Sequence, residues 1–148
     1  MAKTVVAYID VRFFAHATED PDKVAAAVQH VLPNDYVSEI AFDRHTLKGH
    51  YGNPITLSET RIKDKKVIEA FIEKLSADLK ETDKEKVRRE IDRHVENGSL
   101  YLRLDKQAAL HDELALCTAD PIRVRIRFKK SSLADIITIC KELNLLKD

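Results

Sequence analysis

The stretch DPIRVRIRFKK, Asp120–Lys130, decides the fold because apolar and basic residues alternate along it almost without interruption. Alternation with a period of two is typical of a β-strand with one face in the core and the other face uncovered. The apolar residues, which we expect in the core, are Ile122, Val124, Ile126 and Phe128. The basic residues, which we expect on the opposite face, are Arg123, Arg125, Arg127 and Lys129.

The overall charge places no constraint on this basic face. The chain has 148 residues, and its 25 Lys and Arg balance 25 Asp and Glu. A site for a polyanion must therefore arise from segregation of charge on the surface. With 44% hydrophobic residues, the length suits one ordinary core, so we predict a single domain over residues 1–148.

Several classes of protein and site are disfavoured by the sequence. No run of about 18 apolar residues is present, and Asp10 and Arg12 interrupt the apolar N-terminal segment. We therefore expect a soluble, cytoplasmic protein with no membrane span. Cys117 and Cys140 lie in apolar surroundings outside any CxxC pair, and the six histidines show no ligand spacing. The prediction is two buried cysteines, no metal and no cofactor.

Turn and capping signals divide the chain into alternating strands and helices. Asp20 and Pro21 suit a helix start, Thr82 with Glu85 suggests a capping box, and Ser132 opens a last helix. Strands are predicted at 4–17, 36–48, 55–63, 99–105 and 122–128. Helices are predicted at 21–32, 64–79, from 82 to the ENG at 96–98, and from 133 onward, with a helical turn at 106–110.

This order of elements predicts an α+β fold. We expect a two-layer α/β sandwich in which helices cover one face of a mostly antiparallel sheet. Tyr8, Phe14 and Tyr101 alternate with apolar neighbours. They are expected to share the uncovered face with Arg12 and Arg103.

A basic face with aromatic residues favours single-stranded or irregular RNA, because arginine binds phosphate and aromatic rings stack on bases. The alternatives are a solvated face balanced by cross-strand acids, and a face that pairs two copies or docks on another protein. The loop at 47–55 could form a rim of the site through Lys48, His50 and Asn53, or could simply be a turn. The five basic residues at 84–94 are interpreted as a solvated helix face.

Catalytic motifs are missing from the sequence. It contains no GxSxG, P-loop, GxGxxG or HExxH pattern. Asp10, Glu39, Asp43 and Glu59 could lie close together on paired strands, but no spacing defines a site. We predict that the protein is not an enzyme. An enzyme acting on a phosphorylated small molecule would need a deep polar pocket near Gly49–Ile55.

Four blocks of sequence resemble a small family of archaeal RNA-binding proteins described as predicted exosome subunits. The blocks, in order, are ATEDPDKV (17–24), GHYGNPI (49–55), LYLRLDKQAAL (100–110) and DPIRVRIRF (120–128). The resemblance implies a fold like that of ribosomal protein L5, RNA as a partner, and a role with the exosome in RNA processing or degradation. It brings no set of RNA-contacting residues. From charge and position alone, those predicted are Arg123, Arg125, Arg127, Lys129, Arg103, Tyr101, Arg12, Lys48, His50 and Asn53.

Overall fold

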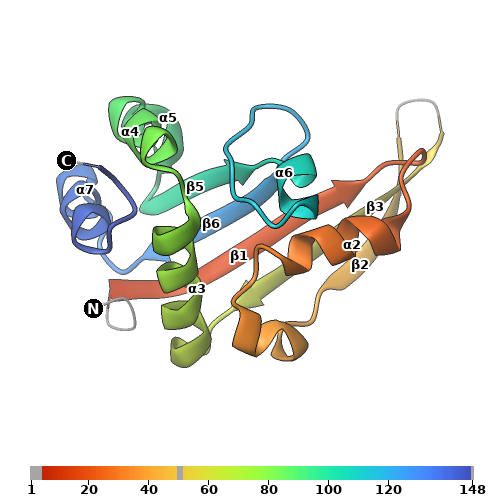
Figure 1. Ribbon diagram of the computed structural model, residues 1–148, viewed down its shortest axis with the longest axis horizontal. Coiled ribbons are helices and arrows are strands. Elements are labelled where there is room, and N and C mark those ends of the chain that lie inside the picture. Colours follow the sequence, from red (N-terminus) through yellow and green to blue (C-terminus); the bar gives the residue numbers. More distant parts are fainter. Residues whose placement is uncertain (1–4, 50–51, 148) are drawn as a thin grey trace.

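The computed structural model describes residues 5–49 and 52–147, and its central feature is a six-stranded antiparallel sheet. The strand order is β2-β3-β1-β6-β5-β4, so β1 and β6 lie at the centre (Figure 1). The strands are β1 (Val6–Ala15), β2 (Asp43–Lys48), β3 (Pro54–Ile62), β4 (Val95–Glu96), β5 (Ser99–Leu104) and β6 (Ile122–Phe128).

Strand β6 confirms the alternation from which the fold was predicted. Its four apolar side chains are at most 1% exposed, and the three arginines between them are only partly buried. On one side β6 pairs with β1, where Arg12 lies opposite Arg123 and Asp10 opposite Arg125. On its other side it pairs with β5, which places Arg103 opposite Arg123.

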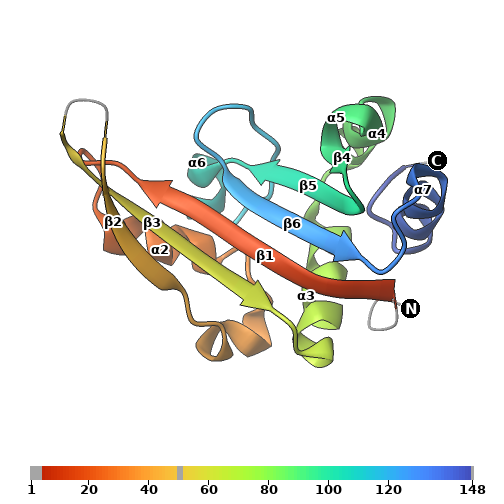
Figure 2. The same ribbon diagram turned by 180° about the vertical axis from the view of Figure 1, so that it is seen from behind.

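Helices cover one face of this sheet, as predicted. The helices are α2 (Pro21–Gln29), α3 (Lys65–Asp78), α4 (Glu81–Arg89), α5 (Ile91–His94), α6 (Lys106–Leu110) and α7 (Leu133–Glu142). Helices α2, α3 and α6 lie across the sheet in Figure 1, and Figure 2 shows the strands from the uncovered side. The side chains of Asp20, Asp64 and Ser132 cap α2, α3 and α7. None of the helices within the described ranges has the length and apolar character needed to cross a membrane.

The strand predicted at 36–48 is wrong in its first half. Asn34–Glu39 form a 3-10 helix, and β2 begins only at Asp43. Tyr36, Val37, Ile40 and Phe42 pack against the core. The spacing of one and three residues among Tyr36, Val37 and Ile40 suits a helical turn better than a strand, in which successive side chains alternate between faces.

The helix predicted from Thr82 to 96–98 is also wrong in its bounds. Helix α4 begins at Glu81 with no side-chain cap, so the expected Thr82 capping box is not formed. The chain then passes through α5 into β4. Asn97 and Gly98 both have positive φ, 50° and 82°. They form a two-residue β-hairpin turn, for which Asn-Gly is a preferred sequence.

The burial of two side chains, Lys84 and Cys117, differs from what the sequence predicts. Lys84, expected on a solvated helix face, is 2% exposed, and its Nζ donates a hydrogen bond of 2.6 Å to the Ser76 carbonyl. The prediction of buried cysteines is confirmed for Cys140, whereas Cys117 is only half-buried. Both thiols are free.

Candidate nucleic-acid interface

Figure 2 shows the sheet from the side that the helices leave uncovered, and six arginines belong to this face by strand register. Strand alternation and register place them there from four strands, β1, β3, β5 and β6. They are Arg12, Arg61, Arg103, Arg123, Arg125 and Arg127. The prediction that β6 presents its arginines on one face with Arg12 and Arg103 therefore agrees with the geometry, and Arg61 is an addition that β3 provides.

Three of these arginines form an uninterrupted row across neighbouring strands, which we call the arginine row. Arg123 lies opposite Arg12 on one side and opposite Arg103 on the other, with neighbouring strands about 4.8 Å apart. Among the residues that the structure describes, no carboxylate forms an ion pair with any of the three.

Arg123, at the centre of the row, has an unsatisfied polar atom. Its Nε is buried and has no hydrogen-bond partner among the described residues. Burial lowers the pKa of the Arg123 guanidinium, and the positive charge of Arg12 lowers it further. Both effects mean that the folded protein disfavours the charged form, although the group remains charged at neutral pH.

The remaining arginines of the face have internal partners. Arg61 forms two hydrogen bonds of 2.8 and 3.1 Å to the Asp10 carboxylate. Hydrogen bonding to Asp10 raises the pKa of Arg61. Arg125 Nε donates to Ser99 Oγ at 3.0 Å, and its Nη1 lies 3.8 Å from Asp10 Oδ2. Arg127 donates to the Asn97 carbonyl in the β4–β5 turn. These arginines are therefore less free than the arginine row to bind a ligand.

Aromatic rings are interspersed with these guanidinium groups. The Tyr101 ring lies 5.6 Å from the Arg123 guanidinium and 5.9 Å from that of Arg103, measured to the ring centroid. The guanidinium of Arg61 lies 3.9 Å from the Tyr8 ring, and that of Arg12 lies 5.5 Å from the Phe14 ring. The expected position of Tyr8, Phe14 and Tyr101 on this face is therefore confirmed.

Acidic residues gather on the β2–β3 side of the same face. Asp43 lies opposite Glu59, and Glu59 lies opposite Arg12. Together with Asp10 these carboxylates line a depression of about 270 Å³ that extends to Arg123. Glu39, expected to join this group, is not part of its lining. Arg12, Arg61 and Arg123 line the same depression, so carboxylates and guanidinium groups meet there, and the acidic residues do not extend to β5 or β6.

The other predicted site residues lie apart from the arginine row. Lys129 is exposed just beyond the end of β6. Lys48 and Asn53 lie at the β2–β3 turn, in which Gly49 N donates to the Asn53 carbonyl at 2.6 Å. Strand alternation directs the side chain of Lys48 toward the helix side of the sheet, away from the arginine row. His50 lies outside the described residues.

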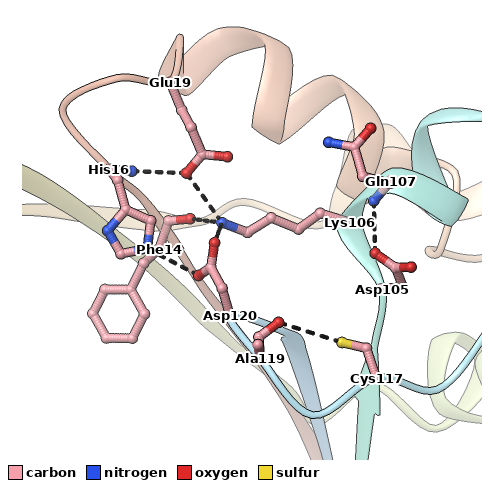
Figure 3. A network of polar contacts seen from close by, with 9 residues as sticks. All are labelled: Phe14, His16, Glu19, Asp105, Lys106, Gln107, Cys117, Ala119 and Asp120. Atoms are coloured by element: carbon pink, nitrogen blue, oxygen red, sulfur yellow. Dashed lines mark hydrogen bonds and ion pairs between the residues drawn. The ribbon is translucent and has the colours of Figure 1, made fainter.

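A polar network at the end of β1 contains three potential metal ligands (Figure 3). One ligand atom from each of His16, Glu19 and Asp120 lies within 4.8 Å of the others. However, Lys106 Nζ binds between the carboxylates, 2.8 Å from Asp120 and 3.3 Å from Glu19, and donates to the Phe14 carbonyl at 2.5 Å. A lysine ammonium therefore supplies the positive charge at this position, and the network fastens α6 to the end of β1.

A family model and a curated relative that match this chain are both described as RNA-binding. A family model described as RNA binding matches residues 8–128. The chain is 35% identical over 124 residues to RNA-binding protein PAB1135 of Pyrococcus abyssi, covering 82% of this chain and 80% of that protein.

Solved structures extend the similarity to the whole fold. Protein AF2318 from Archaeglobus fulgidus has a TM-score of 0.80 at 28% identity, covering 93% of this chain and 99% of its own. Mth689 from Methanothermobacter thermautotrophicus, a DUF54 protein, has a TM-score of 0.75 at 27% identity, covering 97% and 99% of the two chains. The family match spans the strands that carry the arginine row, and the chain belongs to this RNA-binding family.

Proposed function

We propose that this protein is a non-catalytic RNA-binding domain, formed by residues 1–148, which holds single-stranded or irregular RNA on the uncovered face of its sheet. The observation that carries the proposal is the arginine row, in which Arg12, Arg123 and Arg103 are cross-strand neighbours and form no ion pair with a carboxylate in the described part of the chain. Membership of an RNA-binding family supports the choice of ligand.

The arginine row has the charge distribution of an anion site. Like charges directly opposite each other destabilise a sheet. Two unit charges about 6 Å apart repel by roughly 0.7 kcal/mol at the dielectric of water and by roughly 3 kcal/mol at an effective dielectric of 20. A phosphate placed between Arg123 and its neighbours would relieve this repulsion and would accept several charge-assisted hydrogen bonds.

The arrangement of the other side chains favours flexible RNA over a duplex. Tyr101 and Phe14 lie beside the arginine row and offer rings on which unpaired bases can stack. Asp43 and Glu59 occupy the β2–β3 side, where they would repel phosphates. We therefore expect the RNA backbone to cross β1, β6 and β5 along the arginine row.

Fluorescence anisotropy with a labelled oligouridine of about 12 nucleotides tests the proposal. A variant with Arg12, Arg103 and Arg123 replaced by Gln should bind at least about tenfold more weakly, a difference of about 1.4 kcal/mol. If three phosphate contacts are lost, the slope of log affinity against log salt should become shallower by about 2. Unchanged affinity and slope would refute the assignment of the site.

A charge-matched control separates site binding from general attraction. Lys23, Lys65 and Lys66 are exposed on α2 and α3, which lie on the helix-covered side. Replacing these three lysines by Gln changes the net charge equally and should alter affinity by less than about twofold.

Sedimentation of the arginine variant and the wild type also tests homodimerisation. An arginine-dependent dimer that binds no RNA would favour the docking use of this face.

We further propose that the protein is a cytoplasmic accessory factor of archaeal RNA processing or degradation and that it associates with the exosome. Support comes from the four blocks of family resemblance and from the archaeal source of the relative at 35% identity. Gel filtration with a purified archaeal exosome core should show co-elution. Separate elution with and without RNA would refute the association.

The same resemblance implies a fold like that of ribosomal protein L5. We expect a superposition of the two proteins to match the strand order and the connections of the sheet. A different strand order would limit the relationship to the α+β class.

A further inference from the structure

A second depression, which we call the β5-edge pocket, lies where β5 meets α4, α5 and residues 115–118. Its volume is about 260 Å³, just below the usual range of about 300–1,000 Å³ for small-molecule sites. The residues that matter for its chemistry are Lys86, Arg93, His94, Arg103, Leu116 and Cys117.

The walls of the pocket belong to segments that contact the edge of β5 along its length. Strand β4 pairs with Ser99 and Leu100. Residues 115–117 run beside the other end, where Cys117 N donates to the Arg103 carbonyl at 2.9 Å. Between them, His94 Nδ1 lies 3.2 Å from the Tyr101 carbonyl. The hydrogen bonds at both ends hold the walls of the pocket in place.

The β5-edge pocket continues the arginine row. Arg103 belongs to both, since it lies opposite Arg123 on the sheet and also lines the pocket. Lys86 and Arg93 add two more cations, and neither forms an ion pair with a carboxylate in the described part of the chain. Glu90 is the one acidic residue in the lining. A continuous run of five cations therefore leads from β1 over the sheet edge.

The pocket also has an apolar wall. Leu116 and Cys117 contribute to it and are both partly buried. Burial raises the pKa of the Cys117 thiol, and the negative charge of Asp105 raises it further. The side chain is therefore neutral at physiological pH. Cations beside an apolar wall match the two parts of a nucleotide, because the phosphate is anionic and the base has an apolar face.

We propose that the β5-edge pocket binds one nucleotide of the RNA strand that crosses the arginine row. The base lies against Leu116 and Cys117, and Lys86, Arg93 and Arg103 bind its phosphates. The volume admits one base and excludes a stack of several. This inference rests on the proposed RNA-binding function and specifies where the strand leaves the sheet.

The first test removes the two cations that belong only to the pocket. A variant carrying Lys86→Gln and Arg93→Gln should bind the labelled oligouridine about fivefold more weakly or worse. Its salt slope should become shallower by about 1.4, corresponding to two contacts with single-stranded RNA. The matched control is Lys65→Gln with Lys66→Gln on α3, which should leave affinity within about twofold of wild type.

The second test uses Cys117 as a reporter of occupancy. Cys117 lines the pocket, whereas Cys140 is 0% exposed and provides an internal reference. Saturating oligouridine should slow alkylation of Cys117 by N-ethylmaleimide at least about fivefold, as followed by peptide mass spectrometry. In the variant lacking Arg12, Arg103 and Arg123, the same RNA concentration should give little protection.

The outcomes distinguish failure of this inference from failure of the proposed function. Binding that depends on the arginine row, combined with unchanged Cys117 reactivity and full affinity of the Lys86 and Arg93 variant, would overturn the pocket and leave RNA binding intact. No binding of oligouridine by the wild type would overturn both. Protection of Cys117 with weaker binding by the pocket variant supports the inference.

Discussion

Replacing Arg123 by Met should make the folded protein more stable. Methionine keeps a flexible apolar stem and removes the guanidinium that lies opposite Arg12 and Arg103. It also removes the buried Nε that has no partner. Tyr101 loses one neighbouring cation, because its ring lies 5.6 Å from the Arg123 guanidinium.

The magnitude follows from these three contributions. Relief of two like-charge pairs is worth about 1.4 kcal/mol if both are screened as in water. Removal of a buried, unsatisfied donor adds about 1–3 kcal/mol at full desolvation, and the lower end applies because the side chain is only partly buried. Loss of the contact with Tyr101 costs about 0.5–1 kcal/mol. We expect a net gain of about 1–2 kcal/mol in the free energy of unfolding.

Urea denaturation at low ionic strength measures this change, and Arg125→Met is the matched control on the same strand. Arg125 donates to Ser99, whose side chain is buried, and contacts Asp10. Its loss should therefore cost about 1–2 kcal/mol. At about 1 M salt the gain in stability of the Arg123 variant should shrink, because the Debye length is then about 3 Å and the repulsion between the arginines is screened. A less stable Arg123 variant at low salt would refute the idea that the arginine row is strained.

Two further predictions concern buried ionisable groups. Burial raises the pKa of the Cys140 thiol to about 12 from 9.0, so its contribution is fully present below pH 9 and is lost as pH rises toward 12. Cys140→Ala should accordingly show a shallower decline of stability above pH 9 in urea titrations, and parallel curves would contradict this. Lys106→Met should cost about 2 kcal/mol, because Glu19 and Asp120 then face each other without the ammonium. A loss below about 0.5 kcal/mol in urea denaturation would show that water compensates these carboxylates.

The elements that could be predicted from sequence are those with an unambiguous hydrophobic period. In β6 every second residue enters the core, and in α3 Val67, Ile68 and Phe71 repeat at helical spacing. Burial dictates such patterns directly. Asn97 and Gly98 give a clear hairpin signal, but the charged segment before them has helical spacing that continues past the end of α4 and masks this signal.

The roles of the individual arginines could not be predicted, because they depend on strand register. Arg123, Arg125 and Arg127 look equivalent in the sequence. Pairing places Arg125 opposite Asp10 and Arg123 opposite Arg12, and the turn carbonyl of Asn97 accepts from Arg127. Contacts between residues far apart in the chain therefore decide which guanidinium is free. The same holds for the β5-edge pocket, whose lining comes from three separate segments.

The distribution of strain over the sheet argues that the arginine row is functional. A solvated basic face needs only that each charge be hydrated or paired, and Arg125 and Arg61 meet this condition through Asp10. Glu59 already lies opposite Arg12 on β3, so an acidic residue at position 103 would balance the row at its other end. Instead Arg103 extends the positive charge to the sheet edge, where Lys86 and Arg93 continue it. Cations that follow one another along a path, against their mutual repulsion, are the arrangement expected when a polyanion supplies the missing counter-charge.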